Sequence, residues 1–138
     1  MKRLAILLGL AVLLAACGDN HSSINGTWTA ALTGTQQFNF STTLTSISNN
    51  GLSVTNLSFS TQSPCFPGTS TATGAFVVSG TFNGVSAGGF QLTVTSSTGA
   101  NQLQMNGTVH NNTISGTWTL TGTGSGCSGT GTFTMNKG

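Results

Sequence analysis

The stretch QLQMNGTVHNNTISGTWTL, residues 102–120, constrains the fold of this chain more than any other part of it. Asn111 and Asn112 fit a two-residue β-turn, because asparagine tolerates the positive φ that such turns require. This turn sets apolar residues opposite apolar residues on one face: Val109 with Ile114, Gly107 with Gly116, Met105 with Trp118, and Leu103 with Leu120. A slip of one residue would turn one strand's apolar set to the other face. The stretch therefore predicts an antiparallel hairpin with one buried face.

The same alternation continues through most of residues 26–138 and is typical of half-buried strands. The apolar sets are Trp28, Ala30 and Leu32; Phe38, Phe40 and Leu44; Phe76, Val78 and Phe82; Phe90, Leu92 and Val94; Phe133 and Met135. A further strand at 52–59 is less regular. We expect an all-β domain of about eight antiparallel strands in a meander, closed into a small up-and-down barrel. A two-sheet β-sandwich is the alternative.

Two other hairpins have less certain registers. A turn at Asn49-Asn50 pairs Ile47 with Leu52 and Phe40 with Phe59, but the apolar side changes within both strands, which predicts a bulge or sharp twist. A loop from 83 to 89 would set Phe82 against Phe90 and Val78 against Val94.

The amino terminus has the form of an export signal. Lys2 and Arg3 precede the apolar run 4–16, which would span about 20 Å as a helix, against about 30 Å for a bilayer core. Leu14-Ala15-Ala16-Cys17 resembles the lipobox of bacterial lipoproteins at all four positions. We therefore expect a signal peptide at 1–16, a lipidated amino terminus and tether at 17–25, and a single β domain at 26–138.

The lipoprotein resemblance implies that Cys17 carries a diacylglycerol and, after cleavage, an acylated amino group. Two or more acyl chains give stable anchoring, whereas one is marginal. The implied partner is a membrane and the implied location is the bacterial cell envelope. Gly18 is not the Asp that marks inner-membrane retention in some bacteria, which favours the outer membrane, on its periplasmic or surface face.

The near-absence of charge excludes most catalytic chemistry. Asp19 and Lys137 are the only charged side chains of residues 17–138. Paired carboxylates, an oriented Ser–His pair and a metal-ligand cluster all need groups that the β domain lacks. A Lys/Arg footprint for nucleic acid is also missing. We expect no enzyme activity, no metal, no cofactor and no nucleic-acid partner.

Two cysteines remain once Cys17 is acylated. Cys65 lies in SPCFPG, the longest connection, and Cys127 lies in GSGCSG, before the last strand. In an exported protein such a pair predicts one disulfide, which would join two loops at one end of the barrel.

Gly26-Thr27-Trp28 is similar to the Gly-x-Trp motif on the first strand of lipocalins and resembles the opening strand of avidins. Lipocalins also pack an Arg on this Trp, and residues 17–138 contain none. Small eight-stranded barrels either fill their interior with side chains or leave room for one small ligand, so we expect a binding module for a small apolar or glycan ligand. The candidates for lining an interior pocket are Trp28, Phe40, Phe90, Met105 and Trp118. The alternative is a structural or surface-coat envelope lipoprotein in which these side chains only fill the core.

Overall fold

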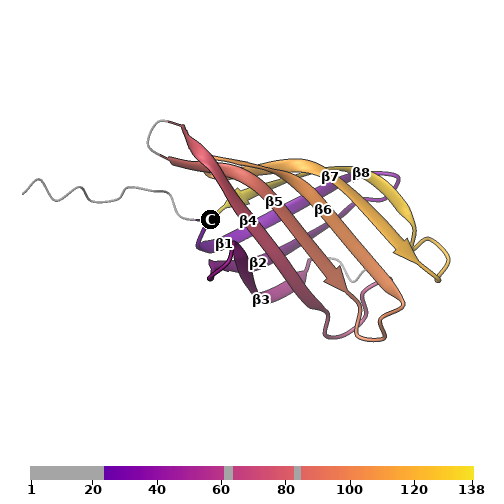
Figure 1. Ribbon diagram of the computed structural model, residues 1–138. Coiled ribbons are helices and arrows are strands. Elements are labelled where there is room, and N and C mark those ends of the chain that lie inside the picture. Colours follow the sequence, from indigo (N-terminus) through magenta and orange to yellow (C-terminus); the bar gives the residue numbers. More distant parts are fainter. Residues whose placement is uncertain (1–23, 61–63, 83–84) are drawn as a thin grey trace, which may run out of the picture.

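The computed structural model describes residues 24–60, 64–82 and 85–138, and the regular elements in this part of the chain are all β-strands. The strands are β1 (Gly26–Gly34), β2 (Phe38–Ser46), β3 (Gly51–Phe59), β4 (Thr71–Phe82), β5 (Val85–Thr95), β6 (Asn101–His110), β7 (Thr113–Gly122) and β8 (Gly129–Lys137). Each strand pairs antiparallel with the next, and β8 returns to β1, so the sheet closes into a barrel (Figure 1). The predicted eight-stranded meander is confirmed, and it forms a barrel rather than a sandwich.

The apolar face of the strands points into the barrel. Along β1, Trp28, Ala30 and Leu32 are buried, while Thr29 and Ala31 between them are exposed. The other strands contribute buried aromatic and aliphatic side chains to the same core. The closed sheet thus buries most of the apolar set that the alternation predicts, but the prediction is wrong for Val78, whose side chain is 53% exposed. No helix among the described residues is long and apolar enough to cross a membrane.

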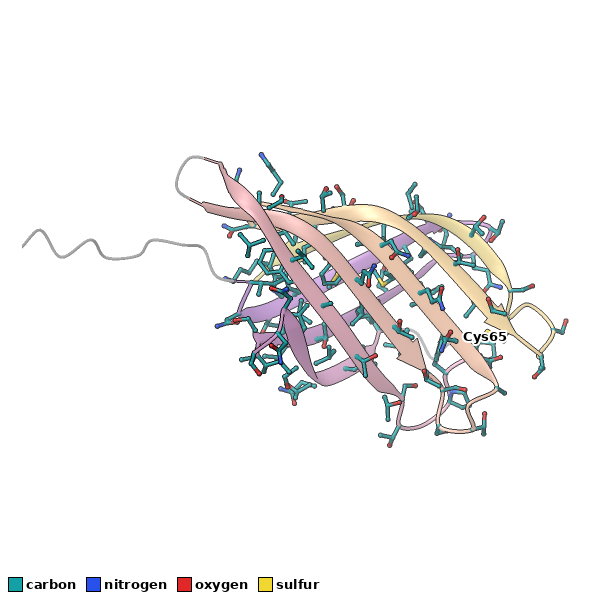
Figure 2. All side chains as sticks on the ribbon, in the orientation of Figure 1. Cys65 is labelled. Atoms are coloured by element: carbon teal, nitrogen blue, oxygen red, sulfur yellow. A yellow bond between two sulfur atoms is a disulfide. The ribbon has the colours of Figure 1, made fainter. Side chains whose placement is uncertain are left out.

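The two ends of the barrel differ. At the N-terminal end, which we define by the start of β1, lie the turn at 47–50, the turn at 111–112 and the last residues of β8. At the opposite end, Cys65 and Cys127 form a disulfide with 5.4 Å between their Cα atoms, and we call this the disulfide end (Figure 2). The predicted disulfide is confirmed. The lipobox and Cys17 lie outside the described residues.

The β6–β7 hairpin has the register that the sequence predicts, from Leu103 opposite Leu120 to Val109 opposite Ile114. Asn111 has a positive φ of 56°, as the turn requires. The facing glycines belong to a longer row across four strands: Phe90, Gly107, Gly116 and Phe133. The rings of Phe90 and Phe133 lie 6.2 Å apart, so two phenylalanines from the flanking strands fill the space that the two glycines leave.

The β2–β3 hairpin confirms one predicted pair and corrects another. Phe40 lies opposite Phe59, as expected, but Leu52 lies opposite Ser46 and not Ile47. Ile47 belongs to the turn, where its N–H donates to the Gly51 carbonyl at 2.9 Å. The longer turn shifts the register by one residue, and the predicted bulge in β3 shifts it back.

The β4–β5 hairpin differs from the prediction. Phe90 lies opposite Phe76 rather than Phe82, and Phe82 lies opposite Val85. Residues 85–89 are therefore strand and not loop. Gly88 is the reason, because a Cβ there would collide with the Val77 carbonyl on the neighbouring strand. A glycine at this position marks a close approach of two backbones rather than a turn.

Candidate functional site

The five predicted pocket residues all lie inside the barrel. Trp28, Phe40, Phe90, Met105 and Trp118 are each 1% exposed and belong to one core cluster. Both indole N–H groups are bound to backbone: Trp28 Nε1 donates to the Ile24 carbonyl at 2.7 Å. Trp118 Nε1 donates to the carbonyls of Thr33 at 3.0 Å and Thr132 at 3.1 Å. These contacts explain the two tryptophans as structural groups, and a ligand pocket lined by the five stays a prediction.

The barrel wall is weakest between β3 and β4. These neighbours share only two residue pairs, Gly51 with Ala75 and Leu52 with Gly74, whereas β4 and β5 are paired along their whole length. Toward the disulfide end the two strands separate. The facing edges of β3 and β4 there have no strand partner among the described residues.

The separation follows from the bulge in β3. Ser41 pairs with Ser58 and Thr43 with Thr55, so Thr42 faces two residues of β3 instead of one. One of these two, Asn56, has a φ of 51°, in the left-handed region that asparagine tolerates. A bulge of this kind bends and twists its strand. We attribute the departure of β3 from β4 to this single extra residue.

Thr42 holds the bulge from inside the barrel. Its side chain is only 1% exposed, and its Oγ1 donates to the Thr55 carbonyl at 2.8 Å. On the outer side, Asn56 Nδ2 donates to Thr43 Oγ1 at 3.3 Å. Side-chain hydrogen bonds therefore stabilise the bulge on both faces of the sheet.

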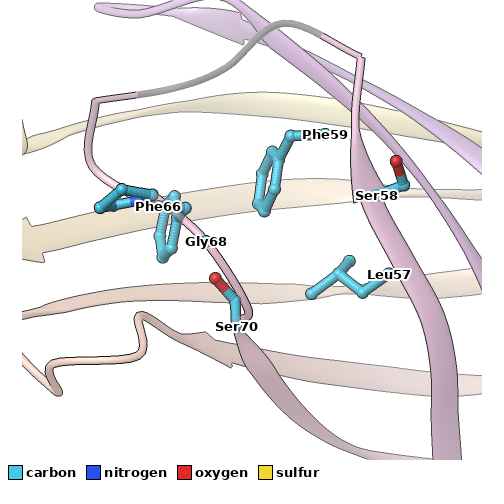
Figure 3. Close-up of a pocket in the computed structure, with 7 residues that line it drawn as sticks. Leu57, Ser58, Phe59, Phe66, Gly68 and Ser70 are labelled. Carbon is cyan, nitrogen blue, oxygen red and sulfur yellow. The ribbon is translucent and has the colours of Figure 1, made fainter.

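The separated strands leave a groove, which we call the seam groove and define by residues 54–59 of β3 and 66–72 of the connection and β4. One part of the groove has a volume of about 360 Å³ and is lined by Leu57, Ser58, Phe59, Phe66, Pro67, Gly68 and Ser70 (Figure 3). A second part, of about 550 Å³, continues along β3 and β4 and shares Leu57, Gly68 and Ser70 with the first.

Stacked aromatic rings form the apolar wall of the seam groove. The rings of Phe59 and Phe66 are parallel within 4° and 5.0 Å apart, and in Figure 3 they face one another across the space between β3 and the connection. Phe59 also packs on Phe40 at 5.5 Å and on Phe38 at 6.0 Å. This half-buried ring thus joins the groove to the core of the barrel.

The polar part of the seam groove is uncharged. Ser70 Oγ is buried and has no hydrogen-bond partner among the described residues, although a buried hydroxyl normally has one. Ser58 adds an exposed hydroxyl, and no lining residue carries a charge. The groove therefore offers an aromatic surface, the exposed hydroxyl of Ser58 and backbone edges to a neutral molecule.

The connection between β3 and β4 is fastened at several points. The disulfide ties Cys65 to Cys127 in the β7–β8 loop. Asn101 Nδ2 donates to the Cys65 carbonyl at 2.7 Å, and Ser97 Oγ donates to the Pro67 carbonyl at 3.3 Å. These contacts hold Phe66 against Phe59, so the disulfide supports one wall of the seam groove.

Sequence reasoning missed this groove. The sequence predicts a bulge or sharp twist in this hairpin and a long connection around Cys65, but it does not show that the two features meet in a site. Only the closed barrel brings Phe66 onto Phe59. The available signal was an apolar residue beside a cysteine, in a connection that a disulfide would fix.

A cation does lie on the tryptophan of the Gly-x-Trp motif. Lys137 Nζ is 6.0 Å from the centre of the Trp28 ring, reached from β8, the strand beside β1. Residues 17–138 contain no Arg, and Lys137 is the cation that lies on this ring. The motif thus helps to fill the N-terminal end of the barrel.

Among the described residues, no group of three or more His, Cys, Asp or Glu side chains could hold a metal ion. No protein-family model, curated protein or solved structure matches this chain in comparison.

Proposed function

We propose that this protein is a lipid-anchored lipoprotein of the bacterial cell envelope, and that its barrel is a non-enzymatic binding module. The anchor is the acylated Cys17 of the lipobox. The binding site is the seam groove rather than the interior of the barrel. Its ligand is small and uncharged, either an apolar molecule or a glycan that presents an apolar face.

The observation that carries this proposal is the unsatisfied hydroxyl of Ser70 beside the Phe59–Phe66 stack. Leaving a buried polar group without a hydrogen-bond partner costs about 1–3 kcal/mol, so such groups are rare in folded proteins. Ser70 Oγ is shielded in the structure, so its side chain rotates toward the groove when a ligand donates to it or accepts from it, and this hydrogen bond would remove the cost. The parallel aromatic wall would contact the apolar side of the same ligand.

The lining also limits the ligand by charge. Placing an ion against an aromatic and hydroxyl surface without a counter-charge is unfavourable. The seam groove has no such counter-charge among its described lining residues. An uncharged ligand is therefore favoured over a phosphate, a carboxylate or an amine.

A second candidate is a structural envelope lipoprotein without a small ligand. The packed positions of Trp28 and Trp118, with both indole N–H groups bound to backbone, favour this alternative over a ligand inside the barrel. A neutral surface favours association between molecules over repulsion. The two candidates differ in whether a molecule occupies the seam groove.

Native mass spectrometry of the protein purified from its own membranes tests the proposal. The expected spectrum contains the polypeptide from Cys17, acyl chains, one disulfide and a further mass that leaves on denaturation. A spectrum with no further mass would support the structural candidate. A spectrum without acyl chains would contradict the anchor.

The Ser70→Ala variant then locates the ligand. Loss of one hydrogen bond worth about 1 kcal/mol should lower the affinity several-fold, while the free energy of unfolding stays equal or rises because an unsatisfied hydroxyl is gone. Ser115→Ala is the matched control, since Ser115 is an exposed strand serine outside the groove. Equal occupancy in the two variants would exclude Ser70 from the site.

A further inference from the structure

The exposed large apolar side chains of the described residues gather at the N-terminal end of the barrel. Ile47 is 56% exposed, Val77 is 52% exposed and Val78 is 53% exposed. Elsewhere the outward positions of the strands are mainly threonine, serine, asparagine and glutamine. The barrel buries most of its Phe and Leu side chains, yet it leaves three large aliphatic groups exposed to solvent at one end.

Two hydrogen bonds, one to a side chain and one to the backbone, connect these residues to the start of the barrel. The Ser46 N–H donates to Asn25 Oδ1 at 2.6 Å, directly before Ile47 and directly before β1. The Phe76 N–H donates to the Asn50 carbonyl at 2.8 Å, directly before Val77. The turn at 47–50 thus joins Ile47, the base of the β4–β5 hairpin and the point where the chain enters the barrel.

The β4–β5 hairpin extends beyond the barrel wall at this end. Pairing with β3 stops at Ala75, and pairing with β6 stops at Gly88, while β4 and β5 stay paired to Phe82 and Val85. Figure 1 shows this hairpin projecting past its neighbours on the side of the carboxyl end of the chain. Val77 and Val78 point to opposite faces of the ribbon, and both are exposed. They lie beyond Ala75, where the β4 edge has no strand partner among the described residues.

We propose that the N-terminal end of the barrel is a membrane-contacting surface, in which the side chains of Ile47, Val77 and Val78 lie in the interface of the lipid bilayer. This inference depends on the proposed lipid anchor at Cys17. The chain from Cys17 to Ile24 can extend at most about 25 Å, and it joins the barrel at this same end. The anchor therefore presents these apolar side chains, and not the disulfide end, to the membrane.

The charge of this end suits a lipid surface. Lys137 is the only Lys, Arg, Asp or Glu among the described residues, and it lies on β8 at the N-terminal end. No acidic side chain of the described residues would repel anionic headgroups. Apolar groups at the interface, in a chain that already has an anchor, fix the orientation of the barrel and leave the seam groove open toward the aqueous phase.

Spin labels on the acylated protein in phosphatidylethanolamine–phosphatidylglycerol vesicles test this orientation. Cys17 carries the lipid in the proposed protein, and Cys65 and Cys127 form the disulfide, so an introduced cysteine is the single free thiol. Ser79→Cys places a label on the exposed part of the hairpin, and Ala100→Cys places a matched label in the β5–β6 turn at the disulfide end. The measurement is the accessibility of each label to oxygen, which concentrates in lipid, and to a water-soluble nickel complex.

The expected oxygen-to-nickel ratio is several-fold higher at the Ser79→Cys label than at the Ala100→Cys label. Adding Val77→Ser and Val78→Ser to Ser79→Cys should lower the ratio toward that of the control, without loss of the acyl anchor. Equal, water-like ratios at both labels would overturn the proposal. A hairpin label that is shielded from both reagents would also overturn it, because a protein surface would then cover the hairpin.

The same samples separate this inference from the anchor. Mass spectrometry counts the acyl chains, and flotation measures the attachment to vesicles. An acylated, floating protein with a solvated hairpin would contradict the membrane-contacting surface alone. A protein that lacks acyl chains would contradict the anchor itself.

Discussion

Removal of the Cys65–Cys127 disulfide is the strongest single perturbation of this barrel. The bond joins residues that are 62 positions apart, in the connection before β4 and in the loop before β8. On the chain-entropy model, a closed loop of that length restricts the unfolded chain enough to stabilise the fold by about 4 kcal/mol. Both cysteines are buried, so Cys65→Ala with Cys127→Ala avoids placing new hydroxyl groups in the core.

The expected result is a loss of about 4 kcal/mol in the free energy of unfolding, which corresponds to roughly 12–20 °C in Tm for a domain of this size. Urea titration followed by the fluorescence of the two buried tryptophans measures this loss. The m-value should rise, because the uncrosslinked unfolded chain exposes more surface. Ser97→Ala, which removes only the exposed hydrogen bond to Pro67, is the control and should change stability by less than about 1 kcal/mol.

The same variant tests the wall of the seam groove. Without the disulfide, Phe66 is held to the barrel only by neighbouring contacts such as the Asn101 bond to the Cys65 carbonyl. Hydrogen exchange in residues 64–70 should accelerate more than exchange in the β6–β7 hairpin. A loss of stability below about 1 kcal/mol, with an unchanged m-value, would refute the reasoning, since the unfolded chain would then be equally compact without the bond.

Two smaller substitutions test the barrel wall. Gly116→Ala should cost about 2 kcal/mol or more, because its Cβ would collide with a backbone carbonyl of β6, whereas Gly89→Ala meets nothing within 4 Å and should be neutral or stabilising in thermal melts. Thr42→Val should cost about 1–3 kcal/mol in urea titrations, because it leaves the Thr55 carbonyl without its hydroxyl donor, while Thr29→Val on the exposed face of β1 should change stability little.

The sequence predicts structure best where two local signals agree. In the β6–β7 hairpin the asparagine turn and the apolar pattern specify the same register, and every predicted pair is present. In the β2–β3 hairpin the turn is one residue longer than predicted, and the bulge at Asn56 compensates for it. The distant pair, Phe40 with Phe59, was therefore right although the pair nearest the turn was wrong.

The β4–β5 hairpin shows why glycine misleads such reasoning. The residues Gly88 and Gly89 suggest a loop, yet both lie within β5. The preference of Gly88 for a strand comes from the approach of the Val77 carbonyl, which is a tertiary contact. The seam groove could not be predicted from the sequence for a similar reason. It depends on how far β3 and β4 diverge after they pair at Gly51 and Leu52.

The bulge itself provides the last prediction, because one deletion should remove it without changing the rest of the pattern. If Asn56 is deleted, Leu52, Val54, Leu57 and Phe59 alternate strictly, and Phe59 still reaches Phe40 across the hairpin. A regular β3 no longer bends away from β4, so the edges of the two strands can pair toward the disulfide end.

We expect the Asn56 deletion, combined with Thr42→Val to remove the hydroxyl that would lose its partner, to be at least as stable as the parent protein. Amides of β3 and β4 along the seam should exchange more slowly, because they gain strand partners. The additional mass in the native spectrum should disappear if the seam groove holds it. A stable variant with unchanged exchange along the seam would show that the bulge does not hold the strands apart. If a variant with a closed seam still retains the bound mass, the ligand binds elsewhere than in the seam groove. The extra residue would then leave the barrel wall incomplete without forming the binding site.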